Sequence, residues 1–122
     1  MENEWVTRLV LFVVMVGAGV LLIWMANAAA SGRLKRNRLA GIRIPSTMAS
    51  EEAWLAAHVR ARRATVCSGV VSVLGGVFAL IPVPMPVVSL GVLVAAVGML
   101  GFVAYAARVG SVAAKAASLR HI

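Results

Sequence analysis

Three side chains that could ligate a metal or transfer protons lie near the middle of the chain: Glu51, Glu52 and His58. Two carboxylates and an imidazole can bind zinc, but neighbouring residues of a helix point about 100° apart. The second histidine, His121, is near the C-terminal end, and metal sites normally need three or four converging ligands. The chain has no hydrolase triad motif, P-loop or dinucleotide-binding motif. We therefore expect no catalytic site, no metal site and no cofactor.

These three residues belong to a polar block, residues 32–63, which contains eight of the twelve Lys and Arg residues of the chain. Gly41 permits a turn with positive φ, and Pro45 pushes the residue before it into an extended conformation. Ser50 is a good N-cap, and the two glutamates after it suit the first turn of a helix. The block therefore predicts a loop followed by a helix.

One face of this predicted helix collects Trp54, Ala57, His58 and Ala61, at spacings of three and four residues. We expect an amphipathic helix that lies at the cytoplasmic membrane surface and bends into the next apolar segment. Trp54 would rest in the lipid headgroup layer. His58 would hydrogen-bond a loop carbonyl or one of the two glutamates.

The elements around this block must lie in a membrane, because the composition does not suit a soluble globule. Of the 122 residues 61% are hydrophobic and only 13% are charged, whereas soluble domains are about a quarter charged. Residues 9–29 would form a helix roughly 31 Å long, enough to cross a bilayer. We expect this helix to be retained rather than cleaved as a signal peptide, because the residues before it are acidic and the apolar run is long.

Two further apolar segments follow the polar block, at residues 64–81 and 87–107. Between them three prolines occur within residues 82–86, and such a run cannot continue a helix. A single kinked helix would be far too long for one crossing. The fold class is therefore predicted to be an all-α integral membrane protein with three transmembrane helices, an interfacial helix after the first and a Pro-rich hairpin turn after the second, all in a single membrane domain over residues 1–122.

The distribution of basic residues predicts the orientation. The polar block and the tail, residues 108–122, hold eleven Lys and Arg residues, and the N-terminal end and the Pro turn hold one. Because cytoplasmic loops are rich in Lys and Arg, we expect the N-terminus outside and the C-terminus in the cytoplasm. The net charge of +8 then reflects topology and attraction to anionic lipids, and we expect no nucleic-acid partner.

Small residues are expected to let the helices pack closely, since lipid offers little hydrophobic drive for helix association. We expect the second and third segments to pack as a hairpin on such a face. No predicted span contains an ionisable residue, which argues against an autonomous pump, channel or coupled transporter. The predicted packing residues are Ser68, Ser72, Gly76, Gly91, Ala95 and Gly98.

The polar block also contains the pattern Asn37-x-x-x-Gly41-Ile42-Arg43-x-Pro45-x-Thr47-Met48-x-Ser50-Glu51-Glu52-x-Trp54-x-x-x-His58. It resembles the SdpI family motif, with Ile44, Ser46 and Met48 where Thr, Trp and Leu are usual. The resemblance implies a bacterial inner-membrane protein of immunity or signal-receptor type. Such a protein protects its producer from a secreted peptide toxin and can hold a transcriptional repressor at the membrane. The motif residues implied to meet a partner are Asn37, Gly41, Arg43, Pro45, Thr47, Ser50, Glu51, Glu52, Trp54 and His58.

The favoured hypothesis is thus a non-enzymatic SdpI-like protein that recognises a peptide or protein at the membrane. Its partners would be membrane lipids and a peptide toxin, a cytoplasmic regulator or a larger membrane complex. The alternative is an accessory subunit of a multisubunit lipid or solute transporter, suggested by the small-residue helices and the uncharged spans. A lipid-modifying enzyme at the membrane surface is the least favoured reading.

Overall fold

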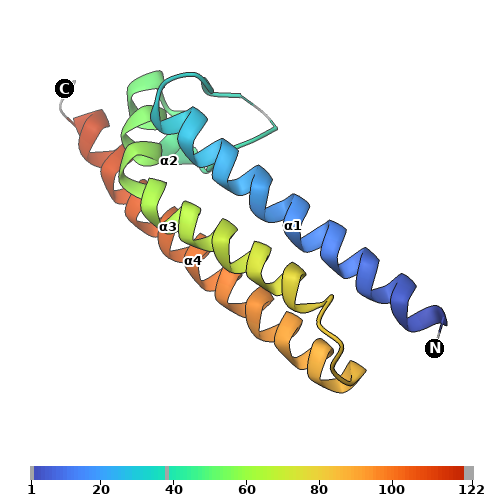
Figure 1. Cartoon of the computed structure of the whole chain (residues 1–122). Helices are drawn as coiled ribbons and strands as arrows, with labels where there is room; N and C mark the ends of the chain where they lie inside the picture. Colours follow the sequence, from blue (N-terminus) through green and yellow to red (C-terminus); the bar gives the residue numbers. More distant parts are fainter. Residues whose placement is uncertain (1, 38, 120–122) are drawn as a thin grey trace.

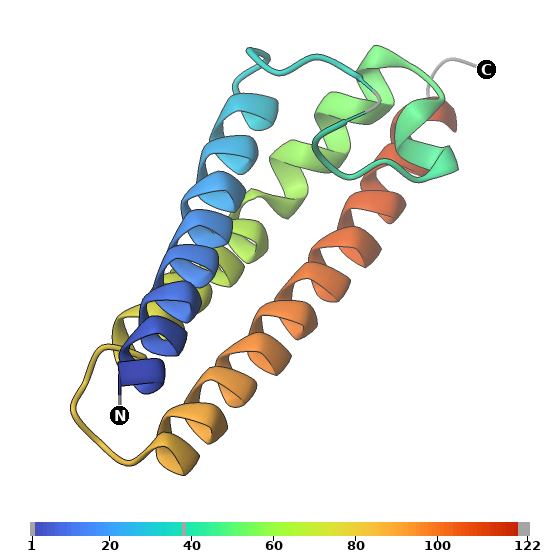
Figure 2. The same cartoon turned by 90° about the vertical axis from the view of Figure 1, so that its right-hand side faces the viewer.

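The computed structural model describes residues 2–37 and 39–119, and helices dominate this part of the chain (Figure 1). The helices are α1 (Glu2–Ala30), α2 (Pro45–Met48), α3 (Glu51–Phe78) and α4 (Met85–Leu119). In Figure 1 α3 lies between α1 and α4, and in Figure 2 its C-terminal half passes behind α1; the extensive helix contacts join α3 to each of them. One end of the bundle carries the loop between α1 and α3, and the other carries the Pro turn.

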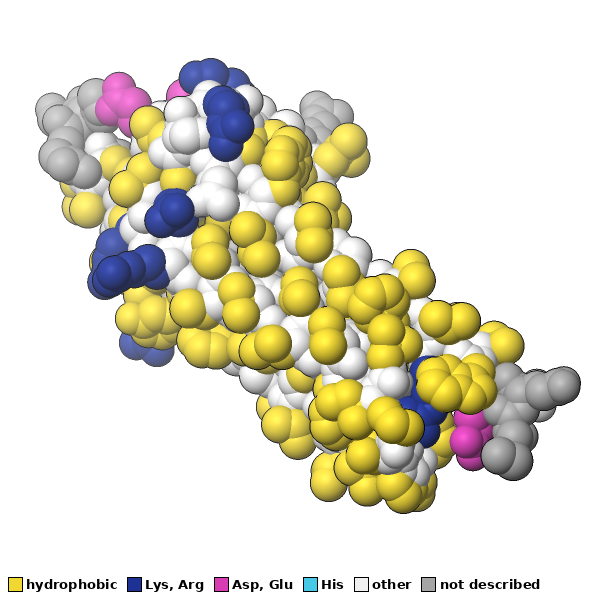
Figure 3. Space-filling model, in the orientation of Figure 1, with side chains coloured by type: hydrophobic (Ala, Val, Ile, Leu, Met, Phe, Trp, Pro, Cys, Tyr) yellow, Lys and Arg dark blue, Asp and Glu magenta, His cyan; other side chains and the backbone are white. Residues whose placement is uncertain are grey.

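Two of the helices are long and apolar enough to cross a membrane: residues Asn3–Ala30 within α1, and Met85–Leu119 of α4. Their large apolar side chains are mostly exposed, as lipid-facing residues would be. Apolar side chains cover the body of the molecule in Figure 3, while Lys and Arg side chains gather mainly at the loop end.

The second predicted span is not confirmed, because α3 does not meet the same test of length and composition. Its first half carries Arg60, Arg62 and Arg63, and the apolar stretch after them ends with the helix at Phe78. That stretch is shorter than the roughly 20 residues usually needed for a straight crossing. The structure thus supports an all-helical protein with two candidate spans.

The predicted surface helix leads directly into the second apolar segment, and the two form one continuous helix, α3. The placement of its first half at the membrane surface stays a prediction. The predicted N-cap is confirmed: the Ser50 hydroxyl accepts a hydrogen bond from the backbone amide of Ala53 at 3.0 Å. Between Glu51 and Gly69 the sequence contains no glycine or proline, so nothing interrupts the backbone hydrogen-bond ladder where the polar face gives way to the apolar one.

The Pro-rich hairpin turn is confirmed, since α3 ends at Phe78 and α4 begins at Met85. The carbonyl of Pro84 accepts hydrogen bonds from the amides of Val87 and Val88, which starts α4. The predicted tail is helical as far as Leu119, and residues 120–122 lie outside the described part of the chain.

The small residues predicted on α3 face two different helices: the first faces α4, and the later ones face α1. The Ser68 hydroxyl donates to the carbonyl of Met99 in α4 at 3.0 Å, whereas the Ser72 hydroxyl donates to that of Met15 in α1 at 2.6 Å. A methyl group on Gly76 would also meet α1. Each step of four residues rotates about 40° around a helix, so a stripe at spacing four faces α4 at its start and α1 at its end.

The small residues predicted on α4 lie against the C-terminal half of α3. The pairs are Gly91 against the ring of Phe78, Ala95 against Gly75, and Gly98 near Val71. Gly19 of α1 and Gly69 of α3 form a further close approach, because a side chain on either would strike the backbone carbonyl of the other.

Candidate functional site

His58 is the centre of the polar block in the folded chain. Only 4% of its surface is exposed. Its Nε2 accepts a hydrogen bond from the backbone amide of Ile42 at 2.9 Å, so its Nδ1 carries the proton and donates to the carbonyl of Trp54 at 2.7 Å. Burial lowers the pKa of His58 below its ordinary value. The neutral ring therefore ties the loop to the first turns of α3.

Trp54 supports the same loop from one helical turn earlier. Its indole nitrogen donates to the carbonyl of Leu34 at 2.9 Å, and its ring lies 4.2 Å from that of His58, centroid to centroid. Its exposed fraction is 1%. The prediction that Trp54 rests in the headgroup layer is therefore wrong, because the loop folds over it and provides a partner for its N–H.

Gly41 lets the loop approach these two rings. Its φ is +103°, a conformation that other residues rarely adopt. A Cβ atom at this position would lie 2.6 Å from Cη2 of Trp54 and 2.9 Å from Nε2 of His58. Both the backbone angle and the contact therefore require glycine.

Thr47 closes the loop on its other side and is fully buried. Its hydroxyl lies 2.6 Å from the carbonyl of Ile42, to which it can donate, and accepts from the amide of Ile44 at 3.1 Å. Pro45 begins α2, a position where its fixed φ suits the first helical turn. Thr47 thus bonds to the carbonyl of Ile42, and His58 bonds to the amide of the same residue.

The remaining motif residues lie on the outer side of the loop. The Asn37 side-chain oxygen accepts from the amides of Leu39 and Ala40, both at 2.8 Å, and so shapes an Asx turn. Arg43, Glu51 and Glu52 are exposed. We call the assembly of residues 34–37 and 39–58 the cap; its inner side is hydrogen-bonded and its outer side is charged.

The cap is joined to the helices by contacts that the sequence did not reveal. The Ser46 and Ser111 hydroxyls lie 3.1 Å apart and link α2 to α4. Just beyond the cap, Nε of Arg62 donates to the side-chain oxygen of Asn27 at 2.8 Å, which links α3 to α1. No spacing rule pairs residues so far apart in sequence, so only the folded chain shows them.

The metal and acid–base candidates do not converge. Glu51 lies 3.6 Å from the Arg36 guanidinium at the surface, while His58 points inward to Ile42. Among the described residues, no group of three or more His, Cys, Asp or Glu side chains could hold a metal ion.

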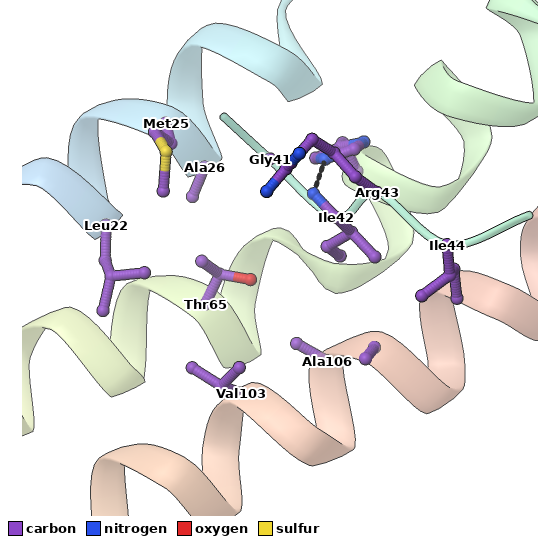
Figure 4. A pocket seen from close by; sticks show the side chains of 12 residues that line it. Leu22, Met25, Ala26, Gly41, Ile42, Arg43, Ile44, Thr65, Val103 and Ala106 are labelled. Atoms are coloured by element: carbon purple, nitrogen blue, oxygen red, sulfur yellow. Dashed lines mark hydrogen bonds between the residues drawn. The ribbon is translucent and has the colours of Figure 1, made fainter. Parts of the chain in front are cut away.

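An apolar pocket of about 250 Å³ lies beneath the loop (Figure 4). Residues 41–44 of the loop lie along one side of it. The three long helices supply the rest of its wall. Their lining residues are Leu22, Met25 and Ala26 of α1, His58 and Thr65 of α3, and Val103, Ala106 and Ala107 of α4.

The opposite end of the bundle has a polar site of a different kind. Arg8, which lies within α1, is 4% exposed. Its guanidinium donates to the carbonyls of Ala79 at 3.3 Å and Ile81 at 2.6 Å, and also to that of Val83. It therefore holds the Pro turn against the start of α1.

One comparison with known proteins gives a match, and the matched residues include the cap. No curated protein and no solved structure matches the chain. The model of the SdpI/YfhL protein family matches residues 33–106, a range that includes the whole cap, all of α3 and the first part of α4. Because this match covers well over half of the 122 residues, the chain belongs to the SdpI/YfhL protein family.

Proposed function

We propose that this chain is a non-enzymatic membrane protein of immunity or signal-receptor type, which recognises a peptide or protein partner through the outer side of its cap. The observation that supports this is the division of the motif. Its buried members, Thr47, Trp54 and His58, use their polar groups on the chain itself. Arg43, Glu51 and Glu52 face outward, where a partner could meet them.

The test is a challenge of cells with secreted peptide toxins from neighbouring strains. Deleting the gene should sensitise cells to one such toxin, and the wild-type gene should restore resistance. Glu52→Lys should abolish most of that resistance, because it reverses a charge on the outer side of the cap. Glu4→Lys is the matched control, since Glu4 is exposed at the far end of α1 and should leave resistance intact. Unchanged sensitivity of the deletion strain to every toxin would contradict the proposal.

The proposal includes a placement in the bacterial inner membrane with the N-terminus outside, the cap and C-terminus in the cytoplasm, and α3 crossing together with α1 and α4. The extensive packing of both candidate spans on α3 supports this. Cysteines can be installed at Ser46 or Val83 after the single exposed cysteine, Cys67, is changed to serine. An impermeant maleimide added to intact cells should label the Val83 site and spare the Ser46 site. Labelling in the reverse pattern would overturn this placement.

A second candidate is an accessory subunit of a larger membrane assembly. It is favoured by an open groove between the first turns of α3 and the last turns of α4, which is lined by Leu55, Val59, Ala113 and Ala117 with Glu52 and Arg60. Leu55 and Val59 are exposed there, outside either candidate span. Purification from native membranes in mild detergent should then yield a stoichiometric complex. Migration of the chain alone in every detergent would rule this role out.

A further inference from the structure

The pocket beneath the cap has the chemistry of a hydrocarbon site. Its lining is apolar apart from Arg43, His58 and Thr65. Both ring nitrogens of His58 are already used within the cap, and the Thr65 hydroxyl donates to the carbonyl of Ala61. Apolar cavities of about 150 Å³ remain dry and accept benzene, so a pocket of about 250 Å³ favours several carbons of a chain over water.

The pocket lies where membrane lipid would reach it. On α1 it lies between Leu22 and Ala26, and on α4 between Val103 and Ala107. The first stretch is near the cap end of the candidate span in α1, and the second lies near the middle of α4, where Val103 and Tyr105 are exposed. Because α1 and α4 pack on α3 and make few contacts with each other, the pocket is left between them, partly open to the side.

A cation is present at the cap side of this pocket. Arg43 belongs both to the pocket lining and to the exposed residues of the cap, and Figure 4 shows it on the loop segment that lies along the pocket. Arg108, the residue after the lining residue Ala107, is also exposed. An amphiphile with its hydrocarbon in the pocket would therefore have its polar end among positive charges. This arrangement complements a phosphate, which guanidinium groups bind through paired hydrogen bonds.

We propose that the pocket binds one hydrocarbon chain of an anionic membrane phospholipid, with Arg43 contacting the lipid phosphate. This inference rests on the proposed membrane placement but not on the proposed immunity role. It gives the cap a second function: the residues that shape the loop, Gly41 and His58, also form the wall of a lipid site. Lipid binding would then stabilise the cap conformation.

Native mass spectrometry of the full chain can test this after exchange into detergent containing equal amounts of phosphatidylglycerol and phosphatidylethanolamine. The wild type should retain one phosphatidylglycerol in preference to phosphatidylethanolamine. Arg43→Gln should lower that preference about fivefold, the change that corresponds to roughly 1 kcal/mol for one cation near the membrane surface. Val103→Phe should reduce retention of both lipids, because the larger side chain fills the pocket.

Two control variants separate the site from general effects. Arg63→Gln removes an exposed cation of α3, and Val97→Phe enlarges an exposed residue of α4; neither position lines the pocket. Both should bind lipid as the wild type does, and circular dichroism should show equal helicity in all five proteins.

Several results would overturn the inference. They are a wild type without preferential lipid, equal loss of preference in Arg43→Gln and Arg63→Gln, or a co-purified peptide in the pocket in place of lipid. If the maleimide experiment fails, the membrane placement and this inference fail together. If labelling succeeds and no lipid preference is found, only the lipid site is wrong.

Discussion

The two ends of the bundle are both held by side chains that bind backbone groups, but they use opposite chemistry. At the cap end, neutral rings are buried: Trp54 donates to Leu34, and His58 accepts from Ile42. The cations there lie mainly on the outside. At the turn end a single cation, Arg8, is buried and donates to three carbonyls.

This difference shows where each end of the bundle keeps its charges. A guanidinium that satisfies three carbonyls is committed to the structure of the turn, because breaking those bonds would leave polar groups buried without partners. In the cap the buried side chains that bind backbone groups are neutral, and at its surface Arg36 donates to the carbonyl of Met48 at 2.9 Å. The polar block therefore keeps its charges on its outer side, whereas the turn end buries its cation.

The largest effect is predicted for Gly41→Ala in the cap. The new residue must adopt φ near +103° and its Cβ must push against Trp54 and His58. Backbone strain and overpacking each cost about 1–3 kcal/mol, so the free energy of unfolding in detergent micelles should fall by roughly 3 kcal/mol. Gly32→Ala is the matched control, because Gly32 has φ +82° but nothing lies within 4 Å of its added Cβ. It should lose about 1 kcal/mol; equal losses in the two variants would show that the ring contact is unimportant.

At the turn end, Arg8→Met should have the next largest effect. Hydrogen bonds to charged groups contribute about 1.5–3 kcal/mol, and this change removes all three while keeping an apolar side chain of similar length. We expect the unfolding free energy to fall by only about 2 kcal/mol, because the part-buried carbonyls of Ile81 and Val83 can bind water once the guanidinium is gone. Amide hydrogen exchange should accelerate at Leu80, Ile81 and Val83, with no change in the cap amide of Ile42.

Arg8→Lys is a stricter version of this test. A lysine ammonium keeps the positive charge but lacks the planar, spread-out donors with which a guanidinium reaches all three carbonyls. It should recover only part of the lost protection at the turn. Faster exchange in the cap as well would contradict the idea that the two ends are held independently.

The sequence predicts the helices well where local signals are strong. Ser50 begins α3 as predicted from its N-cap chemistry, and the prolines end one helix and start the next. It also predicts that the surface helix leads into the next apolar segment, but the predicted second span is not confirmed. Without a breaker after Glu51, the surface helix and the apolar segment merge into α3, although the composition changes between them.

The site was less predictable than the fold. The family motif marks the segment that folds into the cap, but it could not distinguish residues that shape the cap from residues that face outward. Trp54 looks like an interfacial anchor until the loop covers it. Arg8 gave no signal at all, because its partners are carbonyls of the turn, far away in the sequence. Side-chain bonds to distant backbone groups depend on tertiary structure alone.

A pH titration should separate the cap from the turn. Because burial lowers the pKa of His58, the unfolded chain binds a proton more readily than the folded chain. The stability that His58 provides should be fully present above about pH 6.5 and should decline as the pH falls through the lowered folded value. The slope for one group is at most about 1.4 kcal/mol per pH unit, so the loss between about pH 6.5 and pH 5 should not exceed about 2 kcal/mol.

His58→Gln is the control for this titration. Its side-chain oxygen can accept from the Ile42 amide without titrating, so the stability below pH 6.5 should depend less on pH than in the wild type. His121 is present in both proteins and contributes equally to both. The Arg8→Met variant should retain the wild-type slope, and an unchanged slope in His58→Gln would locate the titrating group elsewhere.

The smallest effect is predicted for the ion pair on the outside of the cap. Arg36 and Glu51 lie 3.6 Å apart with side chains that are 36% and 53% exposed. Pairs in such surroundings contribute roughly 0–1 kcal/mol and are screened by salt. A double-mutant cycle with Arg36→Ala and Glu51→Ala should give a coupling energy of about 0.5 kcal/mol in low salt, and less at about 1 M. A larger coupling that resists salt would mean that these charges hold the cap together as Arg8 holds the turn, and that they are not available to a partner.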